Sequence, residues 1–415
     1  MVRCTPLAAL FAHVLHATAC PRLARRGENG TVTPQSFQVQ TRVKPSAPTA
    51  NVAITNVRVW DGYKVDEPST VFISGETIAA PMTNVAQIID GQNGILLPGL
   101  IDAHAHPGSV RDLETLSSYG VTTVLNQNCQ DYEFCSSMRG QIGLSSFFTA
   151  GFSAKGPYSS HANNSDAPLR ELIWEPSQAP AYVQNVFGNG SDWLKIVSEL
   201  NGPDQETQNA LVLHAHALGK SVNTHAADLQ SYIMAIVSKC DGPQHIPLDG
   251  HLNETMVDLM YAQRQYATPT MNVFYDELQI PGAAAILGHP GITFDKGWSF
   301  IKHNVAALYA KGIPILAGTD ATTPYAGQSI SFGISLHYEL WHLFEAGLPT
   351  PDILRAATIT PALAHDILDR GAIQQGMRAD LLLLQPDADP ITSINDTMKI
   401  VRVWNGGLEF TNISK

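Results

Sequence analysis

In the stretch Leu96–Gly108, LLPGLIDAHAHPG, an apolar run turns at Pro98-Gly99 and leads to two histidines. Residues i and i+2 of a strand point to the same face, about 7 Å apart. His104 and His106, separated only by Ala105, therefore share a face. Converging imidazoles most often bind a metal. A chance His-X-His is not rare among 15 histidines, so the rest of the chain must decide.

Residues 98–370 alternate short apolar segments with helical ones. Strands are expected in GVTTVLNQ, SSFFTAGF, DWLKIVSE, SVNTHA, YATPTMNV and IPILAGTD, and amphipathic helices in QETQNALVLHAHALGK and ISLHYELWHLFEAG. Repeated strand–helix units predict an α/β fold, a (β/α)8 TIM barrel whose chemistry lies at the carboxyl ends of its strands. Short strands and turns recur at 51–97 and 371–415, which predicts one small β-domain built from both chain ends.

Polar side chains fall at the expected strand ends. Lys195 is unusual, because a charged lysine inside a buried apolar strand needs a strong reason. Burial favours its neutral amine, which can react with carbon dioxide to form a carbamate that bridges two metals. Each residue taken alone also fits a structural role, as a snorkelling lysine, a core histidine or a loop cap. Together they predict a site for two divalent cations: His104, His106, Lys195, His225, His245 and Asp320, with Asp102 in the first strand.

Other candidates carry weaker signals. His214 and His216 form a second His-X-His, but in a helix they point about 200° apart, so we expect surface and packing roles for them. Tyr158 and His161 follow a strand, where a functional role and a plain turn explain them equally well. Two further residues are candidates for supporting roles: Glu199 as a neighbour of the ligands, and His337 as a packing residue.

The motifs LPGLIDAHAH, DWLKI, THAA, HIPLDG, GTDA, AATITPALAHDIL and GMRADLLLL together resemble the amidohydrolase superfamily, in particular its imidazolonepropionase-like branch. The resemblance covers roughly residues 52–410 and implies a distorted (β/α)8 barrel with an appended β-sandwich. The segment VSELNGPDQ departs from the Ser-Gly-Gly loop that follows the lysine strand in prolidase-like and ochratoxin-hydrolysing relatives. Their carboxypeptidase specificity is therefore not expected. Imidazolonepropionase itself is cytosolic and lacks a lysine bridge, so its reaction is not expected either.

The resemblance also implies roles for individual residues. His104, His106 and Asp320 would bind one metal, usually zinc, and a carboxylated Lys195 would bridge to a second metal held by His225 and His245. A metal-bound hydroxide would be the nucleophile. Asp320 would be the catalytic residue that accepts its proton and returns it to the leaving amine. Tyr158 and His161 would contact substrate, because they match a position at which relatives point a histidine at substrate.

The chain ends predict a route through the secretory pathway. Residues 1–26 combine one arginine, an apolar run and a small-residue stretch before a dibasic Arg25-Arg26, which is typical of a leader, although a buried first helix is the alternative. Residues 27–50 are polar and predict a flexible arm. Cys129 and Cys135 either form a disulfide, leaving Cys240 free, or all three remain thiols. Sequons that would be glycosylated in a secreted protein begin at Asn29, Asn163, Asn189, Asn253, Asn395 and Asn412.

The charge and hydropathy of the sequence exclude some classes of binding partner. A formal net charge of −12 with 15% charged residues argues against nucleic acid, and no later run reaches the roughly 18 apolar residues of a membrane span. We predict a secreted, metal-dependent hydrolase that cleaves a C–N bond of an amide, cyclic amide or N-acyl amino acid. Deamination, lactone or ester hydrolysis and decarboxylation are alternatives, as is a non-catalytic binding protein. The partner is a small molecule, and the resemblance adds a possible homo-oligomer.

Overall fold

The computed structural model describes residues 25–26, 32–33, 38–129, 131–164, 167–280, 291–322 and 330–411. Two short strands, β1 (Arg25–Arg26) and β2 (Val32–Thr33), pair antiparallel. The rest of the predicted leader, much of the predicted flexible arm, and the sequons at Asn29 and Asn412 lie outside the described residues. Among the helices within them, none has the length and apolar character needed to cross a bilayer.

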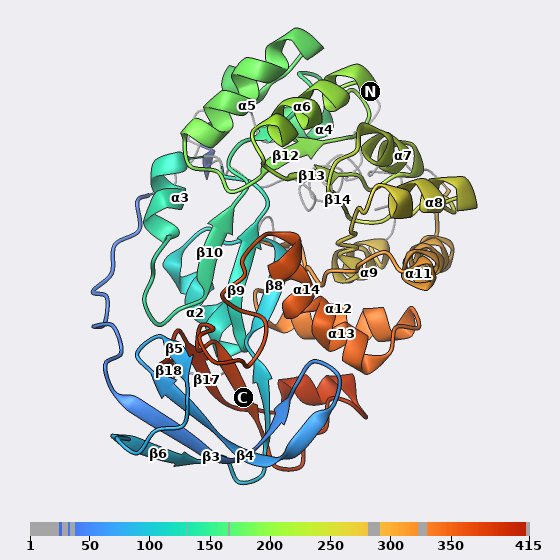
Figure 1. Ribbon diagram of the computed structural model, residues 1–415. Helices are drawn as coiled ribbons and strands as arrows, with labels where there is room; N and C mark the ends of the chain where they lie inside the picture. The colour runs from blue at the N-terminus through green and yellow to red at the C-terminus, as the bar shows by residue number, and fades with distance from the viewer. Residues whose placement is uncertain are drawn as a thin grey trace, which may run out of the picture.

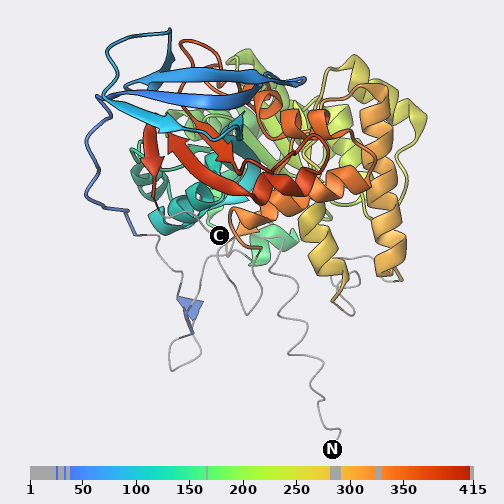
Figure 2. The same ribbon diagram turned by 90° about the horizontal axis from the view of Figure 1, so that it is seen from below.

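An eight-stranded mixed sheet combines strands from both parts of the chain. Its path is β18-β17-β16-β7-β3-β4-β5, with β6 paired to β3. Blue strands from the first part and red strands from the last share this layer (Figures 1 and 2). The junction is the antiparallel pair β7–β16, in which Leu97 faces Leu382. The strands are β3 (Asn51–Trp60), β4 (Val65–Ser74), β5 (Thr77–Ala79), β6 (Gln87–Asp90), β7 (Ile95–Pro98), β16 (Leu381–Leu384), β17 (Ile400–Asn405) and β18 (Leu408–Phe410).

Two parallel four-stranded sheets follow, ordered β10-β9-β8-β15 and β11-β12-β13-β14. Nearly every residue in them is buried, as parallel strands covered by helices require. This confirms the α/β fold. A ring of eight strands and a β-sandwich are not assigned within the described ranges and stay predictions. The strands are β8 (Leu100–His106), β9 (Val121–Asn126), β10 (Ser146–Thr149), β11 (Ser153–Ala154), β12 (Leu194–Val197), β13 (Val222–His225), β14 (Gly242–Gln244) and β15 (Ala321–Thr322).

Helices connect and cover the parallel strands (Figure 1). Several begin at a side chain that accepts a backbone N–H, such as Asp204 before α6 and Asp228 before α7. The helices are α2 (Val110–Ser118), α3 (Tyr132–Met138), α4 (Ser160–Asn164), α5 (Ala179–Gly188), α6 (Gln205–Ala217), α7 (Leu229–Ser238), α8 (Glu254–Ala262), α9 (Met271–Leu278), α11 (Phe294–Lys311), α12 (Ile334–Glu345), α13 (Thr350–Ala356) and α14 (Ile359–Ala364), with 3-10 turns η1 (Leu169–Glu171), η2 (Pro176–Gln178) and η3 (Ile394–Met398).

Two strand predictions are wrong in part. Over YATPTMNV only isolated bridges at Ala267 and Thr268 remain extended, and α9 begins at Met271. Over IPILAGTD a single bridge at Ile315 replaces the expected strand, and β15 begins only at Ala321. In both segments, single parallel bridges take the place of a regular strand ladder.

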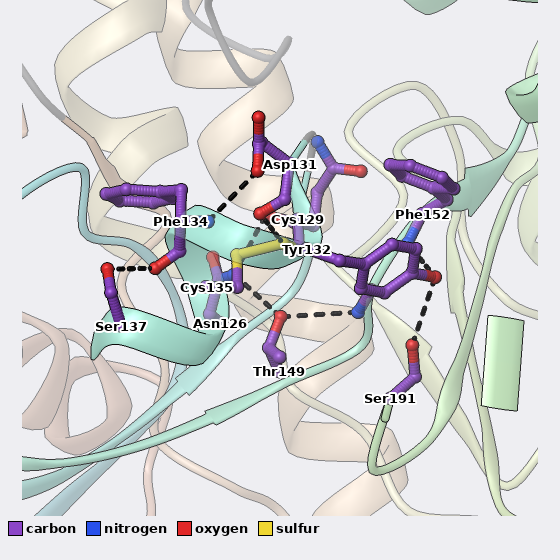
Figure 3. Close-up of a disulfide and its surroundings, with 12 residues drawn as sticks. Asn126, Cys129, Asp131, Tyr132, Phe134, Cys135, Ser137, Thr149, Phe152 and Ser191 are labelled. Carbon is purple, nitrogen blue, oxygen red and sulfur yellow. Dashed lines mark hydrogen bonds between the residues drawn. A yellow bond between two sulfur atoms is a disulfide. The ribbon is translucent and has the colours of Figure 1, made fainter. Parts of the chain in front are cut away.

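Cys129 and Cys135 form a disulfide, with their Cα atoms 6.3 Å apart, and Cys240 is free and buried. The disulfide spans the loop between β9 and α3 (Figure 3). The Tyr132 hydroxyl accepts a hydrogen bond from the Phe152 backbone N–H, which ties this loop to the segment before β11. The bridge prediction is therefore confirmed over three unpaired thiols.

Candidate metal centre

The centre begins where β8 and β15 run side by side. His106 Nε2 lies 2.9 Å and His104 Nε2 lies 3.4 Å from Asp320 Oδ1. Asp320 adopts a left-handed φ of 56° directly before β15, and its backbone N–H donates to the His104 carbonyl. Gly318 permits this approach, since a Cβ there would lie 2.9 Å from the His104 backbone nitrogen. The strand geometry thus aims two imidazoles at one carboxylate.

The second parallel sheet supplies the other predicted ligands. Val197 pairs with His225 in the register of β12 and β13, which places Lys195 two residues before that pair. The ring centroids of His225 and His245 are 4.4 Å apart, and those of His245 and His104 are 4.9 Å apart. Ligand atoms of His104, His245 and Asp320 all lie within 4.8 Å of one another. The imidazoles therefore form one continuous cluster across both sheets.

Burial and neighbouring charges shift the pKa values of the histidines and of Asp320 in this cluster. Burial, reinforced by the positive charge of Lys195, lowers the pKa of His104 to about 3. Burial and the neighbouring histidines hold the pKa of His225 and of His245 well below the usual value. Burial would raise the pKa of Asp320, but His104 and His106 keep it well below its ordinary range. Neutral imidazoles beside an ionised carboxylate are the protonation states that bind a metal.

Hydrogen bonds from outside the cluster orient the rings. His104 Nδ1 is 2.9 Å from Gln244 Oε1, and His245 Nδ1 is 2.7 Å from Thr270 Oγ1. Each bond fixes one ring nitrogen and turns the other, Nε2, toward the cluster, as partners of metal-ligating histidines do. Asp320 Oδ2 is buried and has no hydrogen-bond partner among the described residues. A buried carboxylate with one oxygen beside two histidine nitrogens and the other without a partner fits a divalent cation such as zinc.

Asp102 has a supporting role. Its carboxylate accepts hydrogen bonds from the His104 backbone N–H at 3.1 Å and from the Thr319 hydroxyl at 2.7 Å. Burial raises the pKa of Asp102 to about 7. Asp102 thus joins β8, which carries His104 and His106, to the segment that carries Asp320.

His161 and Tyr158 stand beside the centre rather than in it. The His161 ring centroid is 4.4 Å from that of His225, and its Nδ1 is 2.9 Å from Glu199 Oε2. Burial opposes ionisation of Glu199, but the His161 contact outweighs it and lowers the pKa of Glu199 below its usual range. Tyr158 is 75% exposed. His161, Tyr158 and Glu199 all line a cavity of about 780 Å³ that reaches His225.

Three other histidines weighed in the sequence, His337, His214 and His216, have partners outside the cluster or lie on α6. His337 packs between Thr397 and the Tyr119 carbonyl, as predicted. The assignments within the helical His-X-His are wrong: His216 is exposed and pairs with Asp241, whereas His214 is half-buried. The local pattern cannot show which side of α6 meets a neighbour.

Gln244 and Thr270 are the site residues that sequence reasoning missed. Gln244 directly precedes His245, and Thr270 lies 25 residues beyond His245 in an interrupted strand. A polar residue next to a predicted ligand was the available signal for Gln244. Thr270 gave no local signal, because its contact depends on the turn before α9.

Known proteins share the fold of this chain. The chain is 23% identical over 343 residues to adenine deaminase of Lactobacillus delbrueckii subsp. bulgaricus, covering 80% of this chain and 53% of the deaminase, so it spans about half of that relative. A Xaa-Pro dipeptidase crystal structure superposes with a TM-score of 0.70 at 22% identity, covering 87% of this chain and 99% of the dipeptidase. Phenylurea hydrolase B superposes with a TM-score of 0.71 at 21% identity, covering 88% and 97%.

A family model adds the decisive match. The model of the amidohydrolase family matches residues 95–408, which include every predicted ligand from His104 to Asp320. Membership supports the prediction of a metal-dependent enzyme that hydrolyses carbon–nitrogen bonds. The chain belongs to the amidohydrolase family.

Proposed function

We propose that this chain is a metal-dependent amidohydrolase that cleaves the C–N bond of an amide, a cyclic amide or an N-acyl amino acid. The observation that carries the proposal is the buried group of His104, His245 and Asp320, whose ligand atoms lie within 4.8 Å of one another. When bound, divalent metals acidify water and polarise the scissile carbonyl. His104, His106, Lys195, His225, His245 and Asp320 would hold two of them, with Lys195 carboxylated and zinc the expected metal.

Asp320 has the geometry of a proton carrier. Its Oδ1 faces His104 and His106, while its Oδ2 has no partner among the described residues. The low pKa of Asp320 keeps the carboxylate ionised, so Oδ2 carries no proton before the reaction. Oδ2 would take a proton from the attacking water and return it to the leaving nitrogen. His161, held by Glu199 at the cavity wall, would position substrate together with Tyr158.

We also propose that the two parallel sheets are halves of one distorted barrel with an appended β-sandwich. Single parallel bridges join Gln244 to Thr268 and Ala267 to Ile315, and the Ala103 N–H donates to the Ala317 carbonyl at 2.9 Å. These contacts lead from β14 back toward β8. The proposed domain bounds are 51–97 with 371–415 for the sandwich and 98–370 for the barrel.

Secretion and glycosylation are part of the proposal, and homo-oligomerisation stays a prediction. The Cys129–Cys135 disulfide supports an oxidising compartment. Four sequon asparagines are exposed, as a glycan requires: Asn163, Asn189, Asn253 and Asn395.

Metal content of the purified protein tests the proposed function. We expect about two zinc equivalents in the wild type and fewer in Lys195→Ala. His104→Asn should also lower the metal content, whereas His214→Asn, in the helical His-X-His, is the matched control and should retain it. Zinc content that stays the same in Lys195→Ala and His104→Asn would contradict the assigned ligands.

Turnover is measured on a panel of amides, N-acyl amino acids, esters, lactones and adenine. Hydrolysis of amides that is lost in metal-replete Asp320→Asn supports the proposed reaction. Activity confined to esters, lactones or adenine would favour the alternative reactions. Full activity of the Asp320→Asn enzyme would refute the role of Asp320.

A further inference from the structure

One face of α9 lies over the metal centre. Thr270, directly before the helix, is hydrogen-bonded to His245. Four residues on, the Phe274 ring centroid is 5.8 Å from that of His245, and Phe274 lines the cavity. Glu277 follows at the next position of this face, since residues spaced i, i+4 and i+7 align along a helix. Glu277 therefore follows Phe274 along the helix, one turn beyond the cavity lining, where the negative charge of Asp320 still acts on it.

Glu277 is buried without a partner. Only 3% of the residue is exposed, and neither carboxylate oxygen has a hydrogen-bond partner among the described residues. Burial, with the nearby negative charge of Asp320 adding to it, raises the pKa of Glu277 well above its usual value. A buried, unsatisfied carboxyl is rare in a folded protein, because desolvation destabilises it. Its presence calls for a group that arrives from outside the protein.

The charge around the cavity indicates what that group is. Four lining residues are acidic: Glu199, Asp204, Asp228 and Asp249. The described lining residues include no lysine or arginine, and the histidines among them are His161 and His225. Leu248, Met234 and Phe274 provide an apolar wall. Carboxylates above an apolar wall favour a ligand that joins a positive charge to a hydrophobic body.

We infer that Glu277 is a specificity-determining residue that binds a cationic nitrogen group of the substrate, so the preferred amides carry an amine, amidine or guanidine. This inference rests on the proposed function, because it names the substrate class of the same site. A cationic N–H donor would satisfy both orphaned oxygens of Glu277 at once, as guanidinium groups do with carboxylates. The acidic lining would attract the same cation toward the centre.

Binding of two matched probes tests the inference without requiring turnover. Phenethylguanidinium is permanently cationic, and phenethylurea is its neutral isostere. Their dissociation constants are measured by calorimetry on the zinc-loaded full chain. We expect the guanidinium to bind about tenfold tighter or more, the range of hydrogen bonds to a charged group. Glu277→Gln should make the two probes bind equally. The matched control Asp276→Asn, an acid-to-amide change at the neighbouring exposed position, should keep the preference.

Each outcome has one meaning. Equal affinities for the two probes in the wild type, or an unchanged preference in Glu277→Gln, would overturn the inference. Loss of zinc in Glu277→Gln would also overturn it, because Glu277 would then be a metal ligand. Glu277→Leu repeats the test with an apolar side chain of similar volume should the amide variant fold poorly. If the probe preference holds while no amide is hydrolysed, the proposed function fails and the cation site stands. If amides are hydrolysed and neither probe is preferred, the proposed function stands and the cation site fails.

Discussion

Glu339 makes the stability of this protein depend on pH. The residue is fully buried on α12, and its Oε2 accepts the Asn272 backbone N–H at 2.7 Å. Its Oε1 has no partner among the described residues. Burial raises the pKa of Glu339 from 4.5 to about 8, against the lowering effect of the Asn272 and Met271 amides. The folded protein therefore holds a proton there that the unfolded chain releases.

The sign and size of the effect follow from linkage. Below pH 4.5 both states are protonated, and Glu339 contributes no pH dependence. Between pH 4.5 and about 8 the unfolded chain ionises while the folded state stays protonated, so stability falls as pH rises. At 1.36 kcal/mol per pKa unit, the interval corresponds to a loss on the order of 5 kcal/mol by pH 8.

Glu339→Gln removes this dependence and keeps an acceptor for the Asn272 N–H. We expect wild type and variant to have similar free energies of unfolding at pH 4.5, with the variant several kcal/mol more stable at pH 8. Urea unfolding at fixed zinc, followed by far-ultraviolet circular dichroism from pH 4.5 to 8.5, measures the difference. The matched control is Glu114→Gln, at an exposed position of α2. A constant difference across the pH range would refute the reasoning.

Three further predictions follow from buried contacts. The Lys155 nitrogen lies 2.5 Å from Glu171, and Lys155→Met would leave that buried carboxylate without its cation. We expect urea unfolding to show a loss of about 3–5 kcal/mol in the free energy of unfolding. The double variant Lys155→Met/Glu171→Leu should recover much of this loss. Cys129→Ser/Cys135→Ser should lower the free energy of unfolding by about 2 kcal/mol, since the closed loop is short; reduced wild type should match it. Gln244→Leu should weaken zinc binding about 10–100-fold in chelator competition, because His104 loses its orienting acceptor; unchanged affinity would contradict that role.

The positions of the candidate ligands could be predicted because they depend on local rules. Alternation in β8 alone aligns His104 with His106, and the structure confirms that both approach Asp320. His225 ends β13, and His245 directly follows β14. Carboxyl ends of parallel strands meet at one edge of the fold, so sequence order was enough to group these residues.

Long-range contacts explain what could not be predicted. The strand expected over YATPTMNV gives way to α9, whose Asn272 N–H is held by Glu339 from 67 residues away. The bond between His104 and Gln244 spans 140 residues. Secondary-structure propensity and hydrophobic periodicity depend on residues close together in the sequence, so neither of these contacts could be predicted from them. The same limit reversed the roles of His214 and His216.

The first of these long-range contacts holds the start of α9. The Glu339 carboxyl group accepts the Asn272 N–H at the start of α9, whose N-cap residue, Thr270, makes no side-chain cap bond. Thr270 instead gives its hydroxyl to His245 and adopts a left-handed φ of 47°. A non-glycine residue in that region is strained, and the strain persists only where surrounding contacts over-determine it. Because Glu339 on α12 caps α9, the Thr270 hydroxyl is available to orient His245, a predicted metal ligand. At the start of α9, a bond to the distant Glu339 thus replaces the local cap bond, and the Thr270 hydroxyl contacts His245 of the candidate centre instead.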